Sequence, residues 1–152
     1  MERAVHFVCL LLTAVLAGLM LGLMAYGPTI KKLPGAAFTL VHQGIVKTLT
    51  PVMLLLMPLT VLSSLPVLIV VNRTEFQPSF HFFAVTAGMG FTVASVAATA
   101  IVIRPINNVI AGWNVKGPPA TYIPYRERWQ RYHALRTVFM MLALVSQLLG
   151  AV

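Results

Sequence analysis

The chain has 152 residues, of which 59% are hydrophobic and 9% are charged. Soluble domains carry about 25% charged residues, so this composition excludes an ordinary globular surface and indicates an integral membrane protein. The formal net charge of +8 would suit nucleic acid, but the basic residues are confined to segments that flank apolar runs, as on the inner face of a membrane protein. We therefore expect no nucleic-acid partner.

Four stretches of the chain contain no Asp, Glu, Lys or Arg: residues 4–30, 48–72, 76–103 and 137–152. A helix rises ~1.5 Å per residue and needs ~20 residues to cross the ~30 Å hydrocarbon layer, so the first three are long enough. Their continuous rather than alternating apolarity excludes a β-barrel. The sequence predicts a single all-α domain, an integral membrane four-helix transmembrane bundle with spans near residues 4–27, 36–71, 79–103 and 132–151.

The first two spans each raise one question. The first apolar stretch is longer than the ~7–15-residue core of a signal peptide and no small-x-small site follows it, so we expect a retained helix. The second helix should begin close to Pro34, before its uncharged run. Three prolines, Pro51, Pro58 and Pro66, should bend this helix rather than end it, because neighbouring membrane helices can satisfy the freed carbonyl groups.

The last uncharged run is too short to span. Its sixteen residues cover only ~24 Å, so the helix should begin near Tyr132 or His133, after a polar loop at 104–131. This start places His133 and Arg136 at the membrane boundary. An arginine there either extends to the interface or marks a functional site.

The charges also predict an orientation. Four spans put both termini on one side, where Glu2, Arg3, Arg73 and Glu75 balance. The opposite side carries Glu127 and nine basic residues, which are Lys31, Lys32, Lys47, Arg104, Lys116, Arg126, Arg128, Arg131 and Arg136. The positive-inside rule then predicts a multi-pass membrane protein with its basic loops in the cytoplasm and both termini on the non-cytoplasmic side.

Polar and aromatic side chains gather on three spans near the basic end. On the last helix, a stripe at three- and four-residue spacing contains Arg126, Trp129, Gln130, His133, Arg136 and Thr137. The second span adds Gln43 with His42 beside it, and the third span ends in RPINNVIAGWN, which brings Arg104, Asn107 and Asn108 to the same end. Each residue alone has a structural explanation, as an interfacial anchor or a helix-end cap. Their convergence predicts a polar pocket at the cytoplasmic mouth of the bundle.

The residue types limit the chemistry. The chain has no Asp and its three Glu are dispersed, which excludes a two-carboxylate acid/base pair and a carboxylate-bridged di-iron site within one chain. The single cysteine, Cys9, excludes a disulfide framework. Histidine remains as the versatile group. His42 and His133 are predicted to lie close enough to share a metal, copper or haem iron, and the alternative is that no cofactor is required.

Two segments resemble a known family. RPINNVIAGWN and RERWQRYHALRT are similar to the PxN…RWxxxHxxRT pattern of the anthrone-oxygenase-like family of small four-helix membrane proteins. The earlier GLMLGLMAYGPTIKKLP…FTLVHQGIVKTLTP is similar to its first loop and second helix. The resemblance implies a membrane-bound oxygenase that acts on a lipophilic, anthrone-like aromatic compound.

This resemblance also implies roles for the polar residues. His133 would act as the base and Arg136 as the cation that holds the enolate. The residues implied to bind substrate are Gln43, Asn107, Asn108, Trp129 and Arg126.

Two other functions stay open. The chain would be a non-catalytic partner subunit or small-molecule binder if the polar mouth only fixes the fold. A transporter is disfavoured, because four spans without an internal repeat do not suit alternating access. The expected partners are the lipid bilayer and a lipophilic aromatic small molecule, with a homo-oligomer left open.

Overall fold

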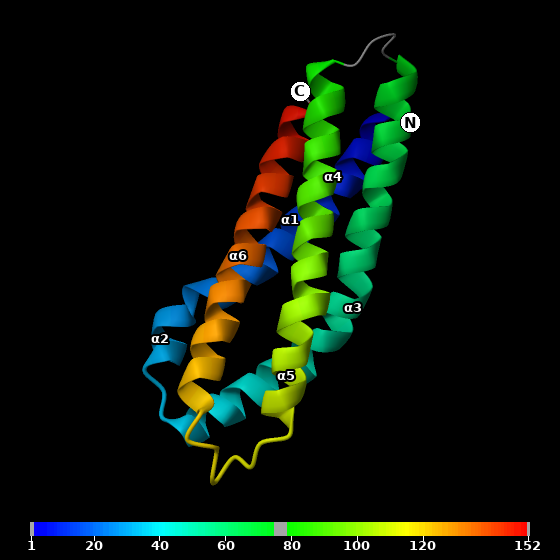
Figure 1. The fold of residues 1–152 in the computed structure, drawn as a ribbon. Helices are drawn as coiled ribbons and strands as arrows, with labels where there is room; N and C mark the ends of the chain where they lie inside the picture. The colour runs from blue at the N-terminus through cyan, green and yellow to red at the C-terminus, as the bar shows by residue number, and fades with distance from the viewer. Residues whose placement is uncertain (1, 75–78, 152) are drawn as a thin grey trace.

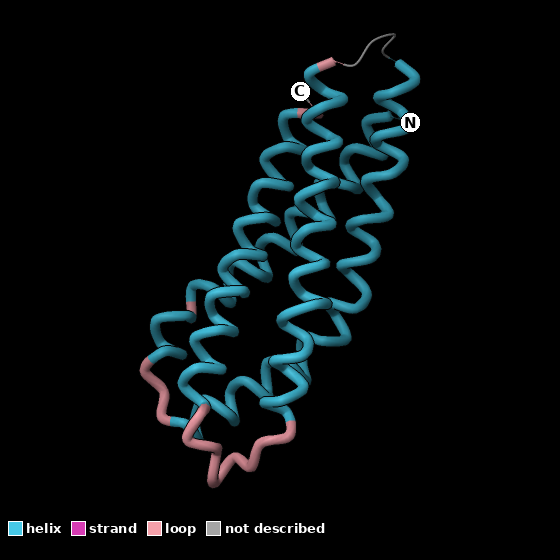
Figure 2. Tube along the Cα trace, in the orientation of Figure 1, coloured by secondary structure: helices cyan, strands magenta, loops and turns pink. Residues whose placement is uncertain are grey.

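The structure, a computed structural model, describes residues 2–74 and 79–151, and every regular element in these ranges is helical (Figures 1 and 2). The prediction of an all-α fold is confirmed. The elements are α1 (Glu2–Ala25), α2 (Gly27–Lys31), α3 (Gly35–Thr74), α4 (Phe80–Ala98), the π-helix η1 (Thr99–Ile103), α5 (Arg104–Ala111) and α6 (Tyr122–Leu149).

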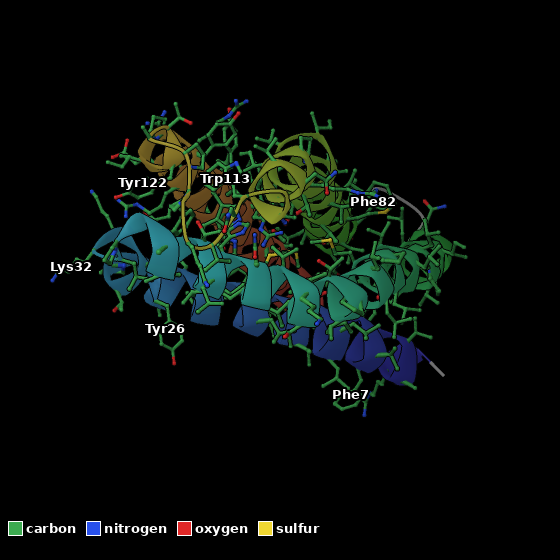
Figure 3. All side chains as sticks on the ribbon, turned by 90° about the horizontal axis from the view of Figure 1, so that it is seen from below. Phe7, Tyr26, Lys32, Phe82, Trp113 and Tyr122 are labelled. Carbon is green, nitrogen blue, oxygen red and sulfur yellow. The ribbon has the colours of Figure 1, made fainter. Side chains whose placement is uncertain are left out.

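Four helical segments are long and apolar enough to cross a membrane, as predicted: Arg3–Lys31, Gly35–Asn72, Phe80–Ala111 and Tyr122–Leu149. Large apolar side chains cover their outer faces, among them Leu54 and Ile101, which are 64% and 73% exposed. Phe7 and Tyr26 point away from the bundle in Figure 3. Such a surface suits contact with lipid rather than water.

Both termini lie at one end of the bundle, and α2 and the connection between α5 and α6 lie at the other (Figure 1). The first part of α3 crosses this second end, and the rest of the helix then rises beside α4. α3 is one continuous helix that contains Pro51, Pro58 and Pro66, so the prediction that these prolines do not end it is confirmed.

The predicted polar loop at 104–131 is wrong. The third span continues through η1 and α5 to Ala111, and α6 begins at Tyr122, so only residues 112–121 join them. Both added segments are amphipathic: Ile106 and Ile110 are buried on α5, and Arg126 and Trp129 on α6. Charged residues mark the edge of the hydrocarbon layer, but an amphipathic helix with a buried face can continue beyond that edge.

The π-helix η1 has a visible cause in the sequence. Pro105 has no backbone N–H and its ring would clash with the carbonyl group four residues earlier, at Ile101. A wider turn with i→i+5 spacing removes this clash without ending the helix. η1 therefore leads directly into α5.

Three buried clusters fill the bundle from end to end. Cys9, Val67, Val71 and Val85 pack near the termini. The middle contains Leu16, Ala17, Met20, Met53, Met57, Met140 and Ala143. The opposite end contains Ile30, Phe38, Ile103, Ile106, Ile110 and Trp129. The apolar core thus continues into the end that carries most of the basic residues.

The 112–121 connection packs tightly onto the start of α3. A Cβ atom at Gly35 would lie 2.9 Å from Pro118 and 3.1 Å from the Tyr122 ring. Only a glycine leaves room for this approach. The contact fixes the beginning of α6 against α3 and thereby helps to position the polar stripe of α6.

Candidate functional site

A cavity of about 450 Å³ lies between α3 and the continuous α4–η1–α5 segment, with α6 behind it. Its walls include Ile45, Val46, Leu49, Thr50, Met53 and Met57 of α3, Thr99, Ala100, Ile103, Arg104, Asn107 and Asn108 of η1 and α5, and Trp129 and Arg136 of α6. The size is in the usual range for a small-molecule site, about 300–1,000 Å³. Most of the wall is apolar, and the polar groups are few.

Arg136 is the buried charge of this cavity. It is only 5% exposed. Its Nη1 donates to Thr99 Oγ1 at 3.0 Å, and its Nε and Nη2 lie 3.0 and 2.8 Å from His133 Nδ1. Both partners are uncharged acceptors. Glu127, the carboxylate of α6, is exposed and lies nine residues earlier, roughly 13 Å away along the helix axis.

The contacts of His133 define its tautomer. Arginine can only donate hydrogen bonds, so Nδ1 of His133 must carry the lone pair that accepts from Arg136. Nε2 then carries the proton and donates to the Met20 carbonyl oxygen at 3.2 Å. Both ring nitrogens are thus occupied. His133 holds the guanidinium of Arg136 in place, and in this arrangement it has no free lone pair for a substrate proton.

His133 and Arg136, which the short uncharged run placed at the membrane boundary, have buried side chains. They are 2% and 5% exposed, inside the bundle. Because α6 begins at Tyr122, both residues lie well within the helix rather than at its first turn. Removing either side chain therefore affects packed contacts, which an exposed interfacial residue does not make.

Trp129 forms the wall between the cavity and the two histidines. Its indole stacks on the His133 ring, with centroids 5.3 Å apart and planes 4° apart. The His42 ring meets the same indole edge-on, with centroids 5.1 Å apart. Trp129 is itself 3% exposed and has packed neighbours on both sides. This packing fixes the orientation of the indole at the cavity wall.

The two histidines do not fit a shared metal. The His42 ring contacts Trp129 and Phe38, the His133 ring contacts Trp129, and the His133 lone pair is used by Arg136. His42 is buried and both of its ring nitrogens lack a hydrogen-bond partner. Oδ1 of the cavity residue Asn107 is also unpartnered. A bound water at this point would satisfy these buried groups.

Two residues expected to bind substrate instead hold helix ends together. Gln43 Nε2 donates at 3.0 Å to the carbonyl oxygen of Ile110, in the last turn of α5, and at 3.0 Å to that of Trp113, just after the helix. Arg126 Nη1 donates to the Leu33 carbonyl oxygen at 2.8 Å, before α3 begins. Neither side chain lines the cavity. Of the predicted site residues, the structure brings Asn107, Asn108, Trp129 and Arg136 to the cavity.

Thr99 is a polar cavity residue that the sequence analysis did not single out. It lies in the middle of an uncharged run and looks like any small residue of a span, yet it binds the buried guanidinium of Arg136. The one available signal was indirect: Pro105 predicts an irregular turn before it, and irregular turns of this kind often occur at functional sites.

These features define a class of protein: a four-helix membrane protein whose bundle holds a partly polar cavity with a buried arginine. Comparison with protein families then identifies the group. The family described as anthrone oxygenase matches residues 37–146, which include every cavity-lining residue except Leu23. The chain belongs to the anthrone oxygenase family. No curated protein and no solved structure matches it.

Proposed function

We propose that this protein is a membrane oxygenase that oxidises a lipophilic aromatic carbon acid of the anthrone type with O2. The observation that carries the proposal is Arg136, a buried cation with only neutral described partners, which faces a largely apolar cavity. A buried charge without an opposite charge is costly in a membrane protein. An anionic ligand in the cavity would compensate it.

The chemistry follows from an enolate. An anthrone loses a proton from its central CH2 group, and the charge moves to the carbonyl oxygen. The enolate carbon gives electrons to O2, one oxygen atom stays on this carbon as the new carbonyl, and the other leaves as water with the two hydrogens of the CH2 group. Anthrone plus O2 thus gives anthraquinone plus water, with no further reductant.

The residues of the cavity suit this reaction. Arg136 would stabilise the enolate oxygen, because a fixed cation in a dry site favours the charge that develops there. His133 would be a positioning residue that aims the guanidinium, which differs from the role of base implied by the family resemblance. The proton would pass to water at the polar mouth. Asn107 and Asn108 would donate to other oxygen substituents, and Trp129 would contact the rings.

The reaction can be tested with 1,8-dihydroxyanthrone as the probe. Purified protein in lipid nanodiscs should consume one O2 per molecule oxidised, and 18O2 should place one labelled oxygen in the anthraquinone. Empty nanodiscs measure the spontaneous reaction. A rate no higher than in empty nanodiscs would reject the oxygenase proposal, and tight binding without added O2 uptake would support a non-catalytic binder.

We also propose that the end with α2 and the 112–121 connection faces the cytoplasm, because it carries most of the basic residues. The test uses a Cys9→Ser background, since Cys9 is the single cysteine. Cysteines are then introduced at the exposed positions Lys116 and Ala151. A membrane-impermeant maleimide added outside intact cells should label Ala151→Cys and leave Lys116→Cys unlabelled. The reverse pattern would overturn the orientation.

A further inference from the structure

We propose that Arg104 is a second anion-binding position of the cavity, so that the preferred ligand carries two acidic groups: an enolate oxygen at Arg136 and a carboxylate at Arg104. The proposal rests on the proposed function in taking an aromatic carbon acid as the ligand. It adds a requirement on the substrate: a second acidic substituent should lie on the side of the ring system away from the enolate oxygen.

The π-helix is the first reason. Thr99 and Arg104 are five residues apart, at the start of η1 and directly after its end. In an α-helix, residues three or four apart share a face and residues five apart do not. An i→i+5 turn brings residues five apart to one face. Accordingly, Thr99, which binds Arg136, and Arg104 both line the cavity.

The depth of the two cations is the second reason. Arg136 is buried, whereas Arg104 is exposed and also lines the cavity. Arg104 is one π-turn beyond Thr99, roughly 7 Å along the helix axis. Asn107 and Asn108 lie on the next turn. One cation is therefore buried and the other exposed at the same cavity, so a ligand that contacts both must extend from the interior towards the exposed side.

The charge of the wall is the third reason. None of the described residues that line the cavity is acidic, and the described contacts of Arg136 are with neutral groups. Two cations that face one partly desolvated space repel each other. A ligand with one anionic group for each cation reduces this repulsion and supplies the opposite charge that each arginine lacks among its described contacts.

An anionic lipid headgroup is an alternative ligand for Arg104, because an exposed arginine near a membrane surface can bind a lipid phosphate as well as a carboxylate. The experiment separates the two sources with nanodiscs of phosphatidylcholine alone and nanodiscs that also contain phosphatidylglycerol. The ligands are two stable anthraquinones, 1,8-dihydroxyanthraquinone and its 3-carboxylic acid. Because neither probe is oxidised, binding is measured independently of turnover.

In phosphatidylcholine, the wild-type protein should bind the carboxylated probe about tenfold more tightly than the other, as expected for one hydrogen bond to a charged group. Arg104→Gln should remove this preference, so that the two probes bind with about equal affinity. Arg131→Gln, an exposed arginine of α6 outside the cavity, is the matched control and should change neither affinity.

Three results would overturn the proposal. The first is equal binding of the two probes by the wild type. The second is an equal loss of both affinities in Arg104→Gln. The third is a phosphatidylglycerol-dependent rise in melting temperature that needs Arg104, without any preference for the carboxylated probe, which would assign Arg104 to lipid. Oxidation of 1,8-dihydroxyanthrone together with any of these results would leave the proposed function standing and reject the second anion position alone.

Discussion

Replacing Arg136 with leucine should lower the rate of anthrone oxidation by ~10²–10³, the usual cost of removing one group that stabilises a developing oxyanion. The empty protein should remain folded. Loss of a buried charge is often neutral or stabilising when an apolar side chain fills the space. Against this, His133 Nδ1 and Thr99 lose their donor, which costs about 1–3 kcal/mol when a buried group is left unpaired. The two changes oppose each other.

The measurement combines initial rates of O2 uptake with melting temperature in the same nanodiscs. Arg131→Leu serves as the control, since Arg131 is an exposed arginine on the same helix. Arg136→Lys keeps the charge but loses the paired contacts with His133, so its rate should fall between the wild type and the leucine variant. An Arg136→Leu protein that oxidises the anthrone at the wild-type rate would remove this cation from the site.

His133→Ala should be less stable than the wild type by about 2–4 kcal/mol and should also lose most of its activity. The substitution removes the acceptor for two guanidinium nitrogens and the ring that stacks on Trp129. An unpaired buried donor costs about 1–3 kcal/mol and an aromatic pair contributes about 0.5–1.5 kcal/mol. Melting temperature and expression in the membrane measure the first effect, and O2 uptake measures the second.

The His133→Gln variant separates positioning from proton transfer. A glutamine amide offers a carbonyl oxygen as acceptor and an NH2 group as donor, in place of the Nδ1 acceptor and the Nε2–H donor of His133, but it cannot take a proton near neutral pH. If His133 only holds Arg136, the glutamine variant should keep substantial kcat and the pH profile of the wild type. A kcat as low as that of His133→Ala, in a glutamine variant that melts like the wild type, would assign the base to His133 instead.

The number of spans could be predicted because it depends on long uncharged runs, and these runs are visible in the sequence itself. The helix ends could not. The first turns of α6 carry Arg126, Arg128 and Arg131. A prediction based on charge therefore assigns this segment to a loop. The burial of Trp129 and the hydrogen bond from Arg126 to Leu33 keep this segment helical, and both depend on where α3 begins.

The candidate site was partly predictable for a similar reason. Trp129 and Arg136 lie on one helical stripe, and the structure places both at the cavity. The role of Gln43 could not be predicted from the sequence. Its partners are backbone carbonyl oxygens of α5 and of the residues after it, and every residue type has such an oxygen. The role of His133 depends on which ring nitrogen faces Arg136, and only the folded structure shows that this is Nδ1.

The hydrogen bonds that join the helices at the basic end affect which substitutions can accumulate in sequences of this family. Gln43, Arg126 and Gln130 each donate to carbonyl oxygens, of Ile110, Leu33 and Gly27 among others. Any amino acid supplies a carbonyl oxygen, so these contacts restrict the residue type at the donating positions but not at the accepting ones. Paired substitutions will therefore not record these contacts. Methods that infer spatial contact from correlated substitutions will not detect the hydrogen bonds that join the helices at this end.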